Sequence, residues 1–422
     1  MIPPMVEASH AAKSSHPIQI VIVGGGAAGF FAAIACAERN PQAQVSILEK
    51  GPQFLSKVRI SGGGRCNVTH HCFDTREFAA RYPRGERNLL SPLSRFQARD
   101  TVDWFQARGV ALKAESDGRM FPTTDSSQTI IDCLVEAARR AQVKLVTHEE
   151  VKEVKPGAAG GFVLALGSGR TIPADRLLMA TGGCRGSGGG HLVESLGHSM
   201  EPSVPSLFTL HVEVPWVRDL AGLSVAEVEV SVPGMTLKEW GPILLTHWGL
   251  SGPVILRLSA WGARLLHACD YRFPVRIDWL PGIKPEALAK RWQTHREHHG
   301  TRSLVNTPFP PLPSRLWEQL VIQSALPRET RWADMSRTRW VGLEHQLKEC
   351  ELPVTGKSLN KDEFVTCGGV KREEVNFKTM ESRLCPGLYL AGELLDVDGI
   401  TGGFNFQAAW TTGWIAGNAM AD

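Results

Sequence analysis

Residues 20–29 read IVIVGGGAAG, a β-branched run followed at once by a glycine-rich turn and an alanine-rich segment. This order predicts a strand, a tight turn and a helix that ends near Asn40. In Gly24-x-Gly26-x-x-Gly29 the glycines allow, in order, a tight turn, room for a pyrophosphate against the backbone, and close packing of helix on strand. The helix N-terminus adds unpaired N–H groups and partial positive charge. The pattern predicts a dinucleotide-binding unit rather than a merely structural turn.

An acidic residue stands at the distance that such a unit requires. A second predicted strand at residues 44–48 is followed by Glu49, twenty residues after Gly29, where a carboxylate meets the adenosine ribose. A glutamate here favours a ribose with a free 2′-hydroxyl over one with a 2′-phosphate. Because FAD and NAD share adenine, ribose and pyrophosphate, this first motif does not distinguish the two cofactors.

Three further glycine-rich turns, at residues 61–67, 181–190 and 392–405, favour FAD. FAD needs contacts to its ribitol and isoalloxazine, whereas a nicotinamide dehydrogenase has no need of a C-terminal glycine strand that returns to the first domain. We expect the helix that begins near Gly402 to bring its N-terminus to the flavin N1/C2 carbonyl edge, where negative charge accumulates on reduction. The alternative is a buried helix cap.

The composition is that of a globular chain. With 422 residues, 43% hydrophobic and 21% charged, and a formal net charge of +3, disorder, a coiled coil and a polycationic tail are disfavoured. The nine cysteines are scattered without a CxxC motif, so we expect free thiols, a cytoplasmic location and no metal site. Residues 1–17 lack the apolar core of a secretory signal and are expected to form a disordered extension. Four glycines interrupt the apolar run at residues 18–37, and no membrane span is expected.

The pattern along the chain predicts an interrupted domain. Residues 18–200 are expected to form the first part of an FAD-binding domain, and residues 351–422 the second part, where a strand enters the C-terminal glycine turn. Between them, the strand-like, proline-interrupted residues 201–280 predict a β-rich insert domain. Residues 281–350 are predicted to be a helical insert segment. The chain therefore leaves its first domain and returns to it.

Several motifs resemble those of the aminoacetone-oxidase-like family of bacterial FAD-binding oxidoreductases, also called BaiN/RdsA-type flavoproteins. The matching text is IVGGGAAG at 22–29, SGGGRCN at 61–67, ATGG at 180–183, THWGLSGP at 246–253, and AGELLDVDG at 391–399 followed by GGFNFQ. The resemblance covers most of the chain from Ile18 onward. It implies an α/β fold in which a Rossmann-like FAD-binding domain of the glutathione-reductase type is interrupted by a β-barrel-like insert and a small helical segment.

The resemblance also implies that Arg65, Cys66 and Asn67 lie along the flavin. A Cys66 thiolate beside Arg65 would have a lowered pKa and redox activity, but no resolving cysteine lies within a few residues, which favours a packing role. His247, in a glycine-rich turn, is either a proton donor or a structural residue. The expected catalytic residues are Arg65, Asn67 and His247. The expected FAD contacts are Gly24, Gly26, Ala27, Ala28, Gly29, Glu49, Lys50, Gly63, Gly64, Arg65, Cys66, Asn67, Val151, Thr181, Gly182, Gly392, Glu393, Gly403, Phe404 and Asn405.

One segment carries more positive charge than the rest of the chain. Residues 281–340 contain ten Lys/Arg and five Asp/Glu, interleaved with Trp292, Trp317, Trp332 and Trp340. Arginine with tryptophan suits phosphate contact and base stacking, which makes RNA a candidate partner. A solvated helical face with the tryptophans in its core is the favoured alternative.

We expect an enzyme that transfers hydride through flavin N5, with a small-molecule substrate bound between the FAD-binding domain and the insert. The leading hypothesis is NAD(P)H-dependent reduction of an activated double bond. The alternatives are oxidation of a small, aminoacetone-like amine, reduction of an RNA uridine to dihydrouridine, and a non-catalytic flavin-binding module. No second complete dinucleotide motif follows, because His191 stands where a third glycine would complete Gly186-x-Gly188. NAD(P)H is therefore expected to visit the FAD cleft transiently.

Overall fold

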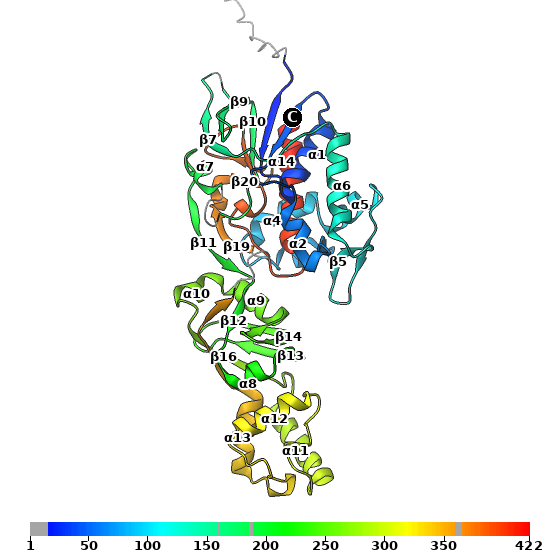
Figure 1. Ribbon diagram of the computed structural model, residues 1–422, viewed down its shortest axis with the longest axis vertical. Helices are drawn as coiled ribbons and strands as arrows, with labels where there is room; N and C mark the ends of the chain where they lie inside the picture. The colour runs from blue at the N-terminus through cyan, green and yellow to red at the C-terminus, as the bar shows by residue number, and fades with distance from the viewer. Residues whose placement is uncertain (1–15, 159, 185–188, 359–364) are drawn as a thin grey trace, which may run out of the picture.

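The computed structural model describes residues 16–158, 160–184, 189–358 and 365–422, to which the description below is confined. Figure 1 shows an elongated molecule with a sheet and its helices at one end, a β-rich middle and a small helical part at the other end. The predicted disordered extension at residues 1–17 lies, except for its last two residues, outside the described residues. The loop with Gly186-x-Gly188 lies outside them as well.

A seven-stranded sheet organises the first end of the described chain, in the order β20-β21-β22-β10-β1-β2-β6. The pairs β10–β22, β1–β10, β1–β2 and β2–β6 are parallel. The strands in the middle of the sheet, β22, β10 and β1, consist mostly of apolar residues, and these residues are buried. The C-terminal strand β22 lies beside β10, so the chain does return to its first sheet. The strands are β1 (Gln19–Val23), β2 (Gln44–Leu48), β6 (Lys144–Val146), β10 (Arg176–Met179), β20 (Val375–Asn376), β21 (Glu381–Ser382) and β22 (Leu388–Leu390).

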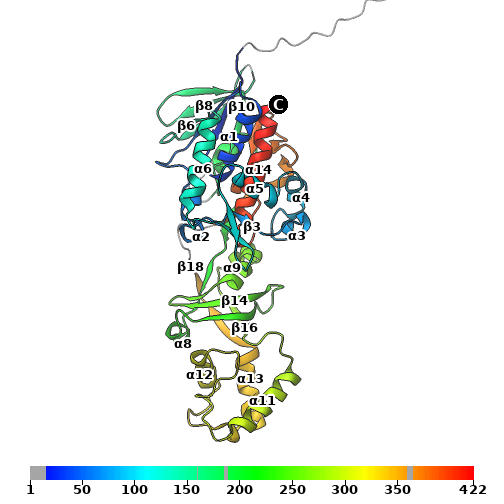
Figure 2. The ribbon, with the colours of Figure 1, turned by 90° about the vertical axis from the view of Figure 1, so that its right-hand side faces the viewer.

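Helices from both ends of the chain pack on this sheet. α1 (Ala27–Arg39) and α14 (Phe404–Ala421) lie side by side in both views (Figures 1 and 2). Their backbones touch, because a Cβ on Gly413 or Gly417 would lie only 2.4 or 2.2 Å from a carbonyl oxygen of α1. The other helices here are α2 (Ser56–Gly64), α3 (Thr75–Ala79), α4 (Glu86–Arg95), α5 (Ala98–Gln106), α6 (Ser127–Arg140) and α7 (Gly190–Glu194).

Three smaller sheets complete this end of the molecule. One has the order β3-β5-β4, another β7-β8-β9, and the third pairs β11 with β19. The strand β19 leads back from the insert toward the glycine turn after β22. The bounds are β3 (Thr69–His70), β4 (Leu112–Ala114), β5 (Arg119–Pro122), β7 (Val151–Pro156), β8 (Phe162–Leu166), β9 (Thr171–Ala174), β11 (Met200–Ser206) and β19 (Val365–Val370).

The middle of the molecule is an antiparallel seven-stranded sheet in the order β17-β16-β13-β14-β15-β12-β18. Its two edge strands are separated in the chain by Thr355 alone, so the sheet curls until its edges approach each other. The range expected to be β-rich also contains helices, since Pro253–Trp261 and Ala263–Ala268 form α9 and α10. The other elements are β12 (Thr209–His211), α8 (Pro215–Asp219), β13 (Ser224–Ser231), β14 (Lys238–Thr246), β15 (Gly249–Ser251), β16 (Phe273–Asp278), β17 (Cys350–Val354) and β18 (Gly356–Ser358).

The far end consists of α11 (Pro285–His299), α12 (Ser314–Gln323) and α13 (Arg337–Lys348). The four tryptophans of this segment are its core: Trp317 and Trp332 are fully buried, and Trp292 and Trp340 nearly so. Trp317 and Trp332 stack on each other with ring centroids 5.9 Å apart. The idea that these tryptophans stack on RNA bases is therefore wrong, because their rings are already covered by protein.

Candidate functional site

A cavity of about 960 Å³ opens between the carboxyl ends of the parallel strands and the β-rich middle of the molecule. Ligands of open α/β sheets bind at this end of the strands. Its walls come from stretches far apart in the chain, which include the turn after β1, the turn after β2 with α2, the turn after β10, the β-rich sheet, and the turn between β22 and α14. The predicted residues that line it are Gly24, Gly26, Ala27, Ala28, Glu49, Lys50, Gly63, Asn67, Thr181, Gly182, Gly392, Glu393, Gly403 and Asn405.

The three glycines of the first motif differ in what surrounds them. Gly24 has a positive φ of +112°, and a Cβ there would lie 2.3 Å from the carbonyl oxygen of Ala180. At Gly29, which does not line the cavity, a Cβ would lie 2.1 Å from the carbonyl oxygen of Gly24. Both positions therefore require glycine for the packing of turn, helix and strand within the protein.

Gly26 is different, because neither its backbone angles nor its protein neighbours require a glycine at this position. A Cβ at this position meets no atom within 4 Å, and φ of −93° is open to any residue. Gly26 lines the cavity and is the N-cap of α1, which has no side-chain cap and no acidic residue in its first turn. The open space and the unpaired N–H groups of α1 fit a pyrophosphate. The residues present thus fit a dinucleotide such as FAD.

Glu49 is held in place by the backbone. Its two carboxylate oxygens accept the N–H groups of Gly25 (2.9 Å) and Gly51 (2.8 Å). Each oxygen keeps a further lone pair that can accept a ribose hydroxyl. This arrangement ties the end of β2 to the glycine turn after β1, which fixes the ribose site relative to the pyrophosphate site.

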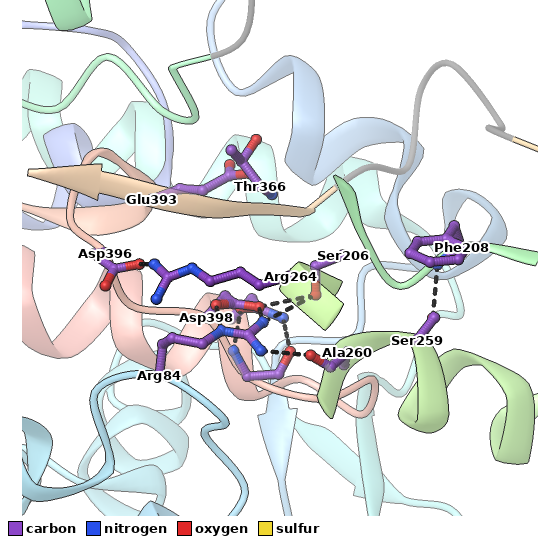
Figure 3. Close-up of polar contacts among 12 residues, drawn as sticks. Arg84, Ser206, Phe208, Ser259, Ala260, Arg264, Thr366, Glu393, Asp396 and Asp398 are labelled. Carbon is purple, nitrogen blue, oxygen red and sulfur yellow. Dashed lines mark hydrogen bonds and ion pairs between the residues drawn. The ribbon is translucent and has the colours of Figure 1, made fainter. Parts of the chain in front are cut away.

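A polar cluster forms the wall between the turns after β10 and β22. Glu393 accepts the N–H of Thr366 at 2.8 Å and forms an ion pair with Lys57 of α2. Figure 3 shows Glu393 and Thr366 together beside β19. Thr181 also lines the cavity, and its buried hydroxyl has no hydrogen-bond partner among the described residues. A bound ligand with an acceptor or donor at this point would satisfy it.

The C-terminal turn presents the start of α14 to the cavity. Gly403 is the N-cap with φ of +93°, and a Cβ there would lie 2.5 Å from the backbone of Thr69. In the amide orientation that satisfies both contacts, Asn67 donates to the carbonyl of Thr69 (3.1 Å) and accepts the N–H of Gly403 (3.0 Å). Asn405 clamps Gly399 through two hydrogen bonds of 2.8 and 2.9 Å. The turn is thus rigid, with the first N–H groups of α14 available to a ligand.

Several predicted contacts do not line the cavity: Gly29, Gly64, Arg65, Cys66, Val151, Phe404 and His247. Val151 is buried in β7. Phe404 packs on the His70 ring, with centroids 4.8 Å apart, and its carbonyl accepts the hydroxyl of Tyr82 (2.7 Å). His247 is exposed, whereas its neighbours Thr246 and Trp248 face the cavity.

The turn that carries Arg65 directs its side chain away from the cavity. Its guanidinium pairs with Glu115 (2.6 Å) and Asp125 (3.6 Å) and covers the Phe121 ring at 4.0 Å. Arg119 lines the cavity in its place, and its guanidinium is held by Glu115 at 2.8 Å and by Asp117 at 2.7 Å. Sequence reasoning missed Arg119, because it stands on β5, outside every glycine-rich motif.

Cys66 is fully buried, with φ of +63°. Burial raises the pKa of its thiol to about 12, although the Ser61 hydroxyl acts in the opposite direction. The thiol therefore stays protonated at neutral pH, which is the reverse of the lowered pKa that redox catalysis needs. The packing role is the one that fits this geometry.

The β-rich sheet supplies the opposite wall. Its lining residues are mostly apolar or carry hydroxyls, and they include Leu207, Phe208, Thr209, Thr246, Trp248, Ser251, Leu256 and Ser358. Trp248 is 69% exposed, and the ring of His211 is nearly parallel to it, at a centroid distance of 6.3 Å and an angle of 22°. The THWG turn at residues 246–249 was predicted to contribute to the site, but through His247, whereas the residue that lines the cavity is Trp248.

A buried ion pair joins the two walls (Figure 3). Arg84, which precedes α4, donates to Asp398 at 2.6 Å and to the carbonyl of Ala260 in α9 at 2.5 Å. The hydroxyl of Ser206, at the end of β11, donates to Asp398 at 2.8 Å. Burial raises the pKa of Asp398, and the neighbouring Arg84 guanidinium opposes that rise. These contacts fix the β-rich sheet against the cofactor side of the cavity.

Two further properties bear on the site. In the described part of the chain, none of the helices combines the length and apolar character needed to cross a membrane. Among the same residues, no group of three or more His, Cys, Asp or Glu side chains is arranged to hold a metal ion. The polar side chains that line the cavity carry hydroxyls, amides, three cationic groups and two carboxylates.

Comparison with known proteins gives a match over nearly the whole chain. Residues 18–419 match the family described as HI0933-like protein Rossmann domain. The chain is 32% identical over 412 residues to a 3-dehydro-bile acid delta(4,6)-reductase of Clostridium scindens. This alignment covers 96% of this chain and 99% of the relative. It is also 32% identical over 403 residues to a ribosomal RNA dihydrouridine synthase of Escherichia coli, covering 93% and 96% of the two chains.

Solved structures share the fold at low sequence identity. A 3-ketosteroid-delta4-(5alpha)-dehydrogenase from Rhodococcus jostii superposes with a TM-score of 0.51 at 13% identity, covering 97% of this chain and 98% of the other. A 3-ketosteroid delta1-dehydrogenase from Sterolibacterium denitrificans gives a TM-score of 0.50 at 13% identity, covering 95% and 99%. These likenesses concern the arrangement of the backbone.

Proposed function

Since the chain belongs to the HI0933-like Rossmann family and is an FAD-dependent oxidoreductase, we propose that it reduces an activated carbon–carbon double bond with NAD(P)H as the electron donor. The observation that carries the proposal is the continuity of the cavity. One space of about 960 Å³ runs from the glycine cradle at α1 to the wall of the β-rich sheet, so a substrate on that wall shares the cavity with the cofactor. The similar protein of Clostridium scindens is named as a reductase.

In this proposal the cofactor is held by backbone groups at both of its ends. Gly26 and the N-terminus of α1 hold the pyrophosphate, and Glu49 accepts the ribose hydroxyls. The N-terminus of α14, with Gly403 as its cap, faces the isoalloxazine. When bound, FAD supplies hydride transfer at its N5 atom. Asn67 holds the N–H of Gly403 and so fixes the direction in which α14 begins.

The wall of the β-rich sheet suits a flat, largely apolar ring with one polar substituent. Phe208 and Leu256 offer apolar surface, and the hydroxyl of Ser251 can donate to a carbonyl oxygen conjugated to the double bond. Thr246 is less suited to this, because its hydroxyl already donates to the carbonyl of Gly249 at 3.1 Å. Trp248 at the exposed edge of the cavity offers a stacking surface.

NAD(P)H is proposed to visit the same cavity. The turn after β1 is the one complete dinucleotide motif that the sequence carries, and its cradle is assigned to FAD. Cationic side chains of the lining, among them Lys50 and Arg119, offer partners for the phosphates of a second nucleotide. All nine cysteines are free thiols in the part of the chain that the structure describes, which accords with a proposed cytoplasmic location.

The proposed domains separate the part of the chain that holds the cofactor from the part that contacts the substrate. Residues 18–200 and 351–422 are proposed to form the FAD-binding domain, and residues 201–280 the insert that contacts the substrate. The boundary at 351 differs from the structure in one respect, because β17 and β18 belong to the sheet of the insert. Residues 281–350 are proposed as a separate helical segment. Limited proteolysis of the FAD-loaded protein would test this division, since cleavage should cluster near residues 281 and 350 and leave the FAD-binding parts intact.

Anaerobic photometry tests the electron donor and the substrate class. We expect NADH or NADPH to bleach the flavin absorbance, and an α,β-unsaturated cyclic ketone to restore it in the absence of oxygen. Bleaching by aminoacetone but not by NAD(P)H would replace the proposal with amine oxidation. A flavin that neither donor reduces would leave only the binding module.

A second candidate substrate is a uridine in ribosomal RNA. The similar protein of Escherichia coli is named for that reaction, and Trp248 at the edge of the cavity suits stacking on a nucleobase. The test is mass spectrometry of ribosomal RNA after incubation with the protein and NADPH. A gain of two mass units at one uridine, absent without NADPH, would favour RNA over a small enone.

A further inference from the structure

A second pocket lies in the helical part of the molecule, far from the FAD cavity. It measures about 570 Å³ and opens along one side of α11. In both views α11 lies at the opposite end of the long axis from α1 (Figures 1 and 2). We call it the α11 pocket; its lining residues are Ala287, Lys290, Arg291, Thr294, His295, His298, His299, Phe309 and Pro310.

The charge of the α11 pocket has one sign. Lys290 and Arg291 are exposed, and within the described residues neither forms an ion pair. No aspartate or glutamate is among the described residues that line the pocket. Among the described arginines of the segment, Arg328 forms an ion pair, with Glu318 at 3.0 Å, and three others donate to backbone carbonyls. Two adjacent cations that face a hollow without a counter-charge favour an anionic ligand.

Two histidines add unsatisfied ring nitrogens at the same place. Nε2 of His295 and Nδ1 of His299 are buried and have no hydrogen-bond partner among the described residues. The two rings are 4.4 Å apart, and His295 also packs edge-on against Trp332 at 4.4 Å, which fixes its orientation. Buried polar atoms normally have partners, so two orphans in one pocket indicate a ligand that supplies hydrogen-bonding atoms.

The chemistry of these groups separates an anion from a metal ion. Lys290 and Arg291 would repel a cation, and among the described residues no three side chains of metal-ligating type are arranged as a site. Burial, and to a smaller extent the neighbouring His299 and His298, lower the pKa of His295. A tetrahedral oxyanion accepts hydrogen bonds from lysine, from arginine and from an imidazole nitrogen that carries a proton.

We propose that the α11 pocket binds the phosphate group of a nucleotide, with Lys290 and Arg291 as its charge partners. Phe309 and Pro310 give the pocket an apolar side on which the sugar or base rests. The nucleotide is either free or part of an RNA strand, and the phosphate chemistry is the same in both. The basic segment noted in the sequence thus acts through its cations and histidines, since its tryptophans are buried.

The test uses the holoenzyme, so that the FAD site is already filled. Inorganic phosphate and AMP are titrated by calorimetry, and a 5′-labelled oligouridine of twelve nucleotides by fluorescence anisotropy at two salt concentrations. We expect Lys290→Gln/Arg291→Gln to weaken binding at least about tenfold. The matched control is Lys284→Gln/Arg337→Gln, which removes two exposed cations of the same segment outside the pocket and should change affinity less than about twofold.

A second pair of variants tests the histidines. His299→Phe removes the ring nitrogens and should weaken binding, whereas His299→Asn keeps a side-chain nitrogen near the Nδ1 position and should retain more affinity. Circular dichroism and flavin content confirm that each variant is folded. Binding of AMP or phosphate indicates a free nucleotide, and binding of the oligouridine alone, weakened by salt, indicates the backbone of RNA. Absence of binding by all three probes, or binding unchanged in Lys290→Gln/Arg291→Gln, would overturn the proposal.

Discussion

Gly26→Asp gives the sharpest test of the cofactor cradle, because it separates binding from folding. The position has ordinary backbone angles and no atom within 4 Å of a Cβ, so a side chain fits the protein. Gly26 is the N-cap of α1, where aspartate is among the preferred residues and glycine is little worse. We therefore expect the free energy of unfolding of the apoprotein to change by less than about 1 kcal/mol.

The same carboxylate points into the space assigned to the pyrophosphate. Two like charges about 4 Å apart repel by about 4 kcal/mol at an effective dielectric constant of 20, which is a loss of roughly 700-fold in affinity. The matched control is Gly26→Asn, which has the same size and the same capping ability without the charge. Gly342→Asp, in α13 and away from the cavity, controls for added negative charge elsewhere.

The assay is titration of apoprotein with FAD, followed by quenching of flavin fluorescence. We expect Gly26→Asp to purify colourless, with a Kd far above that of Gly26→Asn, and the gap between them to narrow as salt screens the charges. Thermal unfolding of both apoproteins should coincide within a few degrees. If Gly26→Asp purified yellow with a full complement of FAD, the cradle would not hold the pyrophosphate and the assignment would fail.

Three other changes test the remaining walls of the cavity. Trp248→Ala should raise KM for a cyclic enone up to about tenfold with flavin content unchanged, and Trp248→Phe should have a KM close to that of the native protein. Equal KM values for all three proteins would exclude stacking. Arg119→Gln should slow flavin reduction by NAD(P)H in stopped-flow measurements, whereas Arg65→Gln should leave that rate within about twofold and change the stability little. A slower rate in Arg65→Gln than in Arg119→Gln would return Arg65 to the active site. Arg84→Met should lower stability by about 3–5 kcal/mol, because it leaves the buried Asp398 carboxylate without its partner. Burial raises the pKa of Asp398, so protonation on acidification should relieve this loss. The difference in Tm from the native chain should therefore shrink as pH falls from 8 to 5, and a constant difference would argue against an unpaired carboxylate.

The parts of the site that depend on short stretches of sequence could be predicted. The strand, glycine turn and helix at residues 19–39 follow from local periodicity, and Glu49 follows from a fixed spacing after Gly29. Each of the three glycines has the environment that the motif implies, with Gly24 and Gly29 tight against protein and Gly26 open. Local chemistry was sufficient here, because a βαβ unit is built from neighbours in the chain.

The residues that escaped prediction are those placed by tertiary packing. Arg65 follows the glycine turn directly, but the positive φ values from Gly62 to Gly64 reverse the chain and send its guanidinium to Glu115. Arg119 reaches the cavity only because β5 pairs with β3 beside that turn. Composition likewise cannot say whether tryptophans in a basic helical segment face solvent or each other, and the low amphipathicity of such a segment leaves both arrangements open.

The cavity exists only while both of its walls are in place, and this couples the cofactor to the position of the β-rich sheet. One wall is made by the turns of the FAD side and the other by residues of the sheet, and the buried Arg84–Asp398 pair with Ser206 and Ala260 fastens one to the other. A ligand that contacts both walls binds the fastened arrangement and not the separated one, so it stabilises the junction by mass action. Conversely, a change that loosens the junction weakens the binding of any ligand that spans the cavity by the factor by which it lowers the population of the fastened arrangement. The charge pair therefore contributes to ligand binding, although neither Arg84 nor Asp398 lines the cavity.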